Sequence, residues 1–269
     1  DTRRYNRQGL ILLISGAAFT LLTYLLKLYP GLYILTLVLM VYGILQIMAA
    51  ARSRSGKNGG MVEIIHDMKN MPPVMKKLAW VQMFTWFGLF SMFIYCTQAV
   101  TSFHYGSTDP RSALYNEGAN WVGILMAVYN GVAALVVFLI PPVARKIGRV
   151  LTHSLSLVIG GLGLASWVIF REPKLLILSM TAIGIAWASL LTIPYAILAG
   201  SLPQKKMGIY MGIFNFFIVI PQIVAAAILG LLVRNVFGDQ SVYAIVLGGC
   251  TMVIAGILML FVQDTYDKA

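Results

Sequence analysis

The chain has 269 residues, of which 59% are hydrophobic and only 11% are charged, and its mean hydropathy is +0.83. Soluble domains carry roughly 25% charged and 45–50% apolar residues, so a soluble globular protein is excluded. The formal net charge of +11 comes from basic residues between apolar runs, which indicates membrane topology and argues against nucleic-acid binding. Two cysteines within apolar runs and three scattered histidines predict no disulfide, metal site or cofactor.

Eight apolar runs are long enough to cross a bilayer, which takes about 20 residues for about 30 Å of hydrocarbon. Because backbone polar groups cannot be left unpaired in lipid, each run is predicted to be a helix. The sequence therefore predicts an all-α membrane protein with eight transmembrane helices. In chain order they cover residues 9–29, 31–51, 78–103, 119–140, 151–170, 175–200, 208–233 and 242–262.

The basic residues predict the orientation of these helices. If the N-terminus is cytoplasmic, 15 of the 20 Lys and Arg residues fall in cytoplasmic segments and the remaining five in outer segments. Cytoplasmic loops carry such an excess, so both termini are predicted to be cytoplasmic. The chain opens on Asp1-Thr2-Arg3-Arg4 without an initiator methionine, and we expect it to be a piece of a longer protein.

A basic connection divides the chain into two helices and six helices. Such a division is natural for a twelve-helix protein built from two parallel six-helix halves. We therefore predict that residues 1–51 are the last two helices of a truncated N-terminal half, 52–77 a cytoplasmic linker, and 78–269 a C-terminal six-helix half. The linker from Met61 to Lys77 mixes apolar and charged residues, so it is either an amphipathic segment on the membrane surface or a solvated connection.

Three stretches carry a family resemblance: WVQMFTWFGLFSMFIY at residues 80–95, LTIPY at 191–195 and MGIYMGIFNFFIVIPQ at 207–222. They resemble the C-terminal half of bacterial major facilitator transporters related to the plant sucrose–proton symporters and the animal proton-coupled sugar transporters. The resemblance spans roughly residues 60–264. It implies a partial major facilitator fold, a di- or oligosaccharide substrate, a coupling proton or cation, and the bacterial cytoplasmic (inner) membrane. It also implies alternating access, in which the two halves rock around a site near the midplane.

A short loop matches part of a second family motif. The superfamily pattern is Gly-x-x-x-Asp-Arg-x-Gly-Arg, and residues 141–149 read PPVARKIGR at the expected connection. Lys146, Gly148 and Arg149 fit, and the resemblance implies a gating role for them. Arg145 replaces the family's Asp and Pro141 its first Gly. Ordinary positive-inside topology explains the charges of this loop equally well.

No Asp, Glu, Lys or Arg lies in the middle of any predicted span, although such residues usually mark ion pathways. By the resemblance, plant relatives carry acidic residues in the first helix of this half, where this chain reads YCTQ at residues 95–98. We therefore expect the coupling ion to bind in the missing N-terminal helices.

Four spans each present a face of small, amide and hydroxyl residues at spacings of three and four. Amides suit a sugar because they both donate and accept hydrogen bonds, and aromatic rings suit the apolar face of a pyranose. The alternative is that these residues hold the helices together. Trp80 and Trp86 are interpreted instead as anchors at the cytoplasmic interface. The substrate-binding candidates are Tyr95, Gln98, Tyr129, Asn130, Trp187, Tyr195, Asn215 and Gln222.

Pro194 and Pro221 lie inside predicted spans, where each removes a helix hydrogen bond. They are predicted to be either flexing points of a cytoplasmic gate or static kinks.

Two other functions stay open. One is an exporter of drugs or metabolites in the same superfamily, which the amide-rich faces disfavour. The other is a non-transporting sensor on the same fold. A membrane enzyme would need titratable or nucleophilic groups close together, and the sequence has no paired carboxylates, no ligand-spaced histidines and no Ser–His arrangement. We therefore predict that the protein is not an enzyme.

Overall fold

The computed structural model describes residues 2–56 and 59–264, and within them all regular secondary structure is helical, with no strand. The long helices are α1 (Thr2–Leu25), α2 (Leu32–Arg54), α4 (Pro73–Ala99), α5 (Ala113–Val136), α7 (Arg149–Ala165), α8 (Leu176–Leu190), α10 (Met207–Asn235) and α11 (Val242–Met259). Shorter helices are α3 (Gly60–Lys69), α6 (Ile140–Ile147) and α9 (Ile193–Ser201). A π-helical turn, η1 (Val100–His104), extends α4, and single 3₁₀ turns cover Ser166–Val168, Pro173–Leu175 and Gln204–Lys206.

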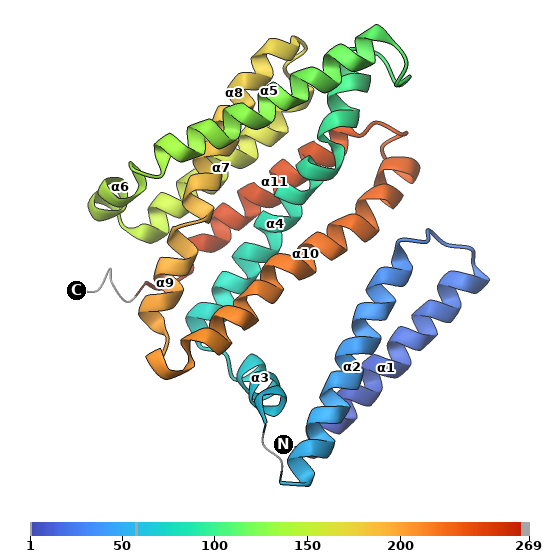
Figure 1. Ribbon diagram of the computed structural model, residues 1–269, viewed down its shortest axis with the longest axis vertical. Helices are drawn as coiled ribbons and strands as arrows, with labels where there is room; N and C mark the ends of the chain where they lie inside the picture. Colours follow the sequence, from blue (N-terminus) through green and yellow to red (C-terminus); the bar gives the residue numbers. More distant parts are fainter. Residues whose placement is uncertain (1, 57–58, 265–269) are drawn as a thin grey trace.

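Eight segments of this described chain are long and apolar enough to cross a membrane, which confirms the predicted fold class. Each coincides with one predicted span, and together they make the chain an integral membrane protein. The connections α1–α2, α4–α5, α7–α8 and α10–α11 lie on one side of the molecule, along the upper and right-hand edges of Figure 1. Thr2 begins α1 and Asp264 follows α11, so each lies at the end of its helix away from these connections.

Two details of the spans differ from the prediction. The span predicted over 175–200 is broken at Leu191–Thr192 into α8 and α9. The span predicted over 119–140 ends at Val136, and a separate short helix, α6, follows it. Both changes occur next to prolines, which cannot take part in a continuous helix ladder.

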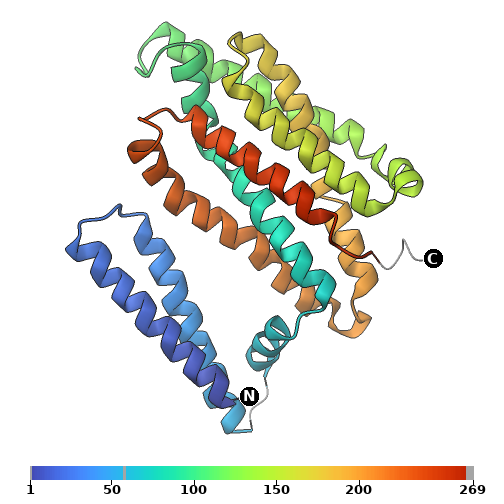
Figure 2. The same ribbon diagram turned by 180° about the vertical axis from the view of Figure 1, so that it is seen from behind.

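The six later spans form one bundle, in which α4 contacts α5, α7, α9, α10 and α11 (Figures 1 and 2). α11 lies against both α4 and α7, and Figure 2 shows it crossing the back of the molecule. Glycines allow this close packing: a Cβ on Gly248 would lie 2.6 Å from the carbonyl oxygen of Gly88, and a Cβ on Gly161 would lie 2.7 Å from that of Gly249. Small residues at helix contacts let membrane helices approach closely, so backbone meets backbone along both sides of α11.

The α1–α2 hairpin stands beside α10, and α3 lies at its lower end in Figure 1. Lys69 of α3 donates a hydrogen bond to Gln8 of α1 and sits 3.9 Å from the centre of the Tyr5 ring. Burial and the nearby Arg4 charge lower the pKa of Lys69. Part of the predicted linker is thus a helix. Residues 57–58 of that linker, and 265–269 of the predicted C-terminal half, lie outside the described chain, and the three-part division of the chain stays a prediction.

Candidate solute-binding site

Four aromatic rings from three helices meet around Trp187 of α8. The centre of its ring lies 5.8 Å from Trp86 and 6.1 Å from Phe93, both on α4. Tyr129 of α5 lies 6.0 Å from Trp187 and 6.4 Å from Phe93. The three pairs that include Trp187 are close to perpendicular, an arrangement favoured by aromatic quadrupoles. We call these four residues the aromatic cluster.

The aromatic cluster exists because α5 and α8 cross at a glycine. A Cβ on Gly184 would lie 2.7 Å from the carbonyl oxygen of Tyr129, so only glycine permits this separation. Trp187 follows Gly184 by three residues and therefore lies on the same face of α8. Tyr129 and Trp86 are buried, Trp187 is half-buried, and Phe93 is 37% exposed. The cluster is therefore anchored in the core on one side and open on the other.

Polar atoms without partners lie beside the buried part of the cluster. Among the described residues, the indole nitrogen of Trp86 has no hydrogen-bond partner, and neither amide atom of Gln82 has one. Gln82 precedes Trp86 by one helical turn and is fully buried. Buried polar groups are nearly always hydrogen-bonded, so three unpartnered atoms on adjacent turns are unusual. They offer both donors and an acceptor next to an apolar ring surface.

The four candidate amides lie at the surface of the described chain. Gln98, Asn130 and Asn215 are exposed, and Gln222 is half-buried. Asn130 donates a hydrogen bond to Met126 of its own helix at 2.9 Å. None of the four bonds to another helix within the described residues, so the interhelical role considered from the sequence has no contact to support it. Asn130 directly follows Tyr129 of the aromatic cluster in the chain, but its side chain bonds back to its own helix.

The remaining two candidates occupy different places. Tyr195 of α9 packs edge-on against Phe214 of α10, with ring centres 5.6 Å apart. Tyr95 of α4 is half-buried and packs against the apolar core. The structure thus brings Tyr129 and Trp187 together and leaves the other six candidates spread over the surrounding helices.

The loop residues predicted to act in gating lie between α6 and α7. Lys146 is exposed in α6, and Gly148 has a φ of +83°, a left-handed conformation that favours glycine. Arg149 begins α7 and lies 3.7 Å from the carboxylate of Asp264, which follows α11. This ion pair connects the motif loop to the C-terminal segment.

The two prolines differ in their surroundings. Pro194 lies in the first turn of α9, directly after the break that separates α8 from α9. The hydroxyl of Thr192 donates to the carbonyls of Ala188 and Ser189 at 2.9 and 3.2 Å, which satisfies acceptors at the break. Pro221 lies inside α10, which continues through it.

Two residues of the aromatic cluster, and a buried histidine elsewhere on α7, were not predicted as site residues from the sequence. Trp86 was predicted to be an interface anchor, yet it belongs to the aromatic cluster, whereas Trp80 is 61% exposed. Phe93 was not considered, although its spacing of seven residues from Trp86 places both on one helix face. His153 of α7 is fully buried and bonds to the Ser189 hydroxyl of α8 at 2.8 Å. A histidine inside a predicted span was the feature of the sequence that could have indicated this buried position.

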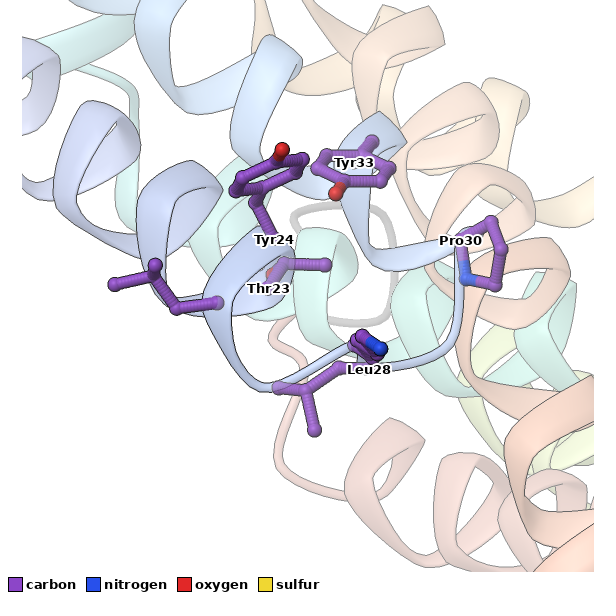
Figure 3. A pocket seen from close by; sticks show the side chains of 7 residues that line it. Thr23, Tyr24, Leu28, Pro30 and Tyr33 are labelled. Atoms are coloured by element: carbon purple, nitrogen blue, oxygen red, sulfur yellow. The ribbon is translucent and has the colours of Figure 1, made fainter.

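Two hollows lie away from the aromatic cluster. One, of about 530 Å³, is formed at the α1–α2 turn by residues that include Thr23, Tyr24, Pro30 and Tyr33, as Figure 3 shows. The other, of about 560 Å³, lies between η1 and the α10–α11 turn. Neither contains a residue predicted from the sequence to bind substrate.

No protein-family model and no solved structure matches the chain. It is 26% identical over 227 residues to sucrose transport protein SUT5 of Oryza sativa subsp. indica, which covers 74% of this chain and 42% of the relative. It is 24% identical over 235 residues to sucrose transport protein SUT1 of Oryza sativa subsp. japonica, with 78% and 44% covered. The chain thus spans less than half the length of these relatives. Over about three-quarters of its own length, it is distantly similar to plant sucrose transporters.

Proposed function

We propose that this chain is part of a secondary transporter that moves a sugar across a membrane by alternating access. Similarity to plant sucrose transporters supports a sugar substrate and favours a di- or oligosaccharide. Coupling to a proton or another cation belongs to the same proposal, with the coupling group in helices that precede this chain. The membrane is proposed to be a bacterial cytoplasmic membrane with both termini inside. Transport rather than an enzymatic reaction agrees with both relatives.

The observation that carries this proposal is the aromatic cluster around Trp187. A pyranose has an apolar face that packs on aromatic rings and a rim of hydroxyls that both donate and accept. Phe93 and Trp187 offer partly exposed ring surface for that face. The unpartnered atoms of Gln82 and Trp86 are buried beside these rings, so they would meet the hydroxyls only in a conformation that exposes them. The exposed amides Gln98, Asn130, Asn215 and Gln222, with Tyr95 and Tyr195, would extend this lining toward the N-terminal half.

The test uses the full-length protein in sealed vesicles with labelled sucrose and maltose. We expect uptake to rise with an inward proton gradient and to fall about tenfold in Trp187→Ala at low sugar concentration, because the variant removes the central ring. Trp80→Ala is the matched control, since Trp80 is exposed and outside the cluster. If Trp187→Ala leaves the uptake rate unchanged, the sugar does not bind at the aromatic cluster. Binding without uptake would favour a sensor, and efflux of unrelated solutes would favour an exporter.

A further inference from the structure

The hollow between η1 and the α10–α11 turn lies on the side of the molecule opposite Thr2 and Asp264. Its lining comes from three separate parts of the chain. Ser102 and Phe103 belong to η1 and Arg171 to the α7–α8 connection, and the third part runs from Asp239 in the α10–α11 turn to Tyr243 in the first turn of α11. These segments lie at the upper right ends of the spans in Figure 1. Its volume of about 560 Å³ falls within the ~300–1,000 Å³ of small-molecule pockets.

Two uncommon backbone conformations meet at this pocket. η1 is a π-helical turn, closed by a hydrogen bond from the Tyr105 amide to the Val100 carbonyl at 3.1 Å. Asp239 has a φ of +61°, which is rare for a residue with a side chain, and its amide donates to the Val233 carbonyl at 2.9 Å. π-turns and left-handed residues cost energy and gather at functional sites. Here they turn Ser102, Phe103 and Asp239 toward one hollow.

The chemistry of the lining selects a neutral ligand with many hydroxyls. Arg171 and Asp239 contribute one charge of each sign, so the pocket favours neither anions nor cations. Gln240 adds an amide that donates and accepts. Ser241 is 1% exposed, and its hydroxyl has no partner among the described residues. Such paired donors and acceptors match sugar hydroxyls.

Two aromatic residues complete the lining. The Arg171 guanidinium lies 4.7 Å from the centre of the Phe103 ring, a cation–π contact that holds the guanidinium in place. Tyr243 packs against Phe237 at 6.0 Å and remains 38% exposed, so its ring is available to a ligand. The pocket is therefore suited to one sugar unit, because it combines a guanidinium, a carboxylate, an amide and a partly exposed tyrosine ring.

We propose that this pocket is a second carbohydrate site, an outer vestibule distinct from the aromatic cluster. The choice of a sugar as its ligand rests on the proposed function, because a sugar transporter is exposed to its substrate at this surface. The proposed sugar-binding residues of the vestibule are the polar lining residues that keep exposed surface, Ser102, Arg171, Asp239, Gln240 and Tyr243.

The experiment is saturation-transfer NMR with sucrose and maltose on the full-length protein in lipid nanodiscs. A Trp187→Ala background weakens the central site and isolates the vestibule. We expect residual sucrose binding there that Gln240→Ala and Asp239→Asn each weaken about fivefold. Asn tolerates the left-handed backbone, so Asp239→Asn changes the charge and leaves the turn intact. Gln204→Ala is the matched control, because Gln204 is an exposed glutamine on the opposite side.

If Trp187→Ala fails to fold, the same vestibule variants are measured in the otherwise unaltered protein. The half-saturation concentration for uptake is then expected to rise about fivefold at an unchanged maximal rate. If the single variant Trp187→Ala no longer binds sucrose at all, the vestibule is not a sugar site. The same conclusion follows if Gln240→Ala and Asp239→Asn leave sucrose binding unchanged. Neither result contradicts the proposed transport function. Vestibule binding without gradient-driven uptake keeps this site and overturns the transport function. No binding of either sugar to any form overturns the vestibule as well.

Discussion

The ammonium of Lys206 lies 2.8 Å from a carboxylate oxygen of Asp67, a residue 139 positions earlier in the chain. Asp67 is buried on α3, and Lys206 ends the turn that leads into α10. Glu63, one turn away on α3, lies 3.2 Å from the same ammonium. Since α3 also contacts α1 through Lys69 and Gln8, this short helix joins the first hairpin to the six later spans.

Removal of the Lys206 charge is expected to loosen α3. Lys206→Ala leaves the buried Asp67 carboxylate without its cation, and we expect amide hydrogen exchange over residues 60–69 to rise about tenfold. The effect is smaller than for a fully buried pair because Lys206 is partly exposed. Glu63→Gln is the control and should change exchange little, since Glu63 is half-exposed. Unchanged exchange in Lys206→Ala would show that apolar contacts alone hold α3.

The crossing of α5 and α8 is expected to tolerate no side chain at Gly184. Gly184→Ala would push its methyl group against the Tyr129 carbonyl, at a cost of about 1–3 kcal/mol and a melting temperature about 3–8 °C lower. Gly123→Ala is the matched control on α5, because nothing lies within 4 Å of its added Cβ. The measurement is thermal unfolding in detergent. Equal melting temperatures for the two variants would contradict the close approach.

The hydrogen bond between His153 and Ser189 is expected to stabilise the packing of α7 on α8. Ser189→Ala leaves a ring nitrogen of a fully buried histidine unpaired, which costs about 1–3 kcal/mol. His153→Ala should cost more because it also opens a cavity. Thermal unfolding of both single variants and the double variant gives the coupling. Additive losses would mean that the two side chains do not interact.

The break between α8 and α9 is expected to affect the rate of transport. The proline inside α10 is expected to have little effect on it. Pro194→Ala permits a continuous helix through Thr192, so uptake should slow several-fold while sugar binding stays unchanged. Pro221→Ala, in an unbroken helix, is the comparison and should leave uptake near its original rate. Initial uptake rates in vesicles and equilibrium binding distinguish these outcomes. Equal rates for both variants would make Pro194 a static kink.

The positions of the eight spans could be predicted because bilayer thickness imposes one length on every apolar run. Pro194 predicted a kink or flexing point, but not that the helix would end at Leu191–Thr192, because Pro221 lies in an unbroken helix. Helical spacing indicated which residues share a face. It gave no information on which faces meet.

The aromatic cluster illustrates this limit. Tyr129 and Trp187 were predicted as site residues on separate helices, but their contact depends on the crossing at Gly184. Trp86 was misjudged because a tryptophan near the end of a span is typical of an interface anchor. Its burial follows from α4 lying against α10 and α11 and from the contact of Trp86 with Trp187 of α8, which are properties of the packed fold rather than of the local sequence.

The glycine contacts along α11 also limit which parts of the protein can move. Helices whose backbones touch, as α11 touches α4 and α7, cannot change their separation or slide without collision. These three helices should therefore behave as one rigid body throughout a transport cycle. The contacts of Gly163 with Ser179 and of Gly184 with Tyr129 hold α8 and α5 to the same rigid body, so motion among these helices falls to α9 and α10.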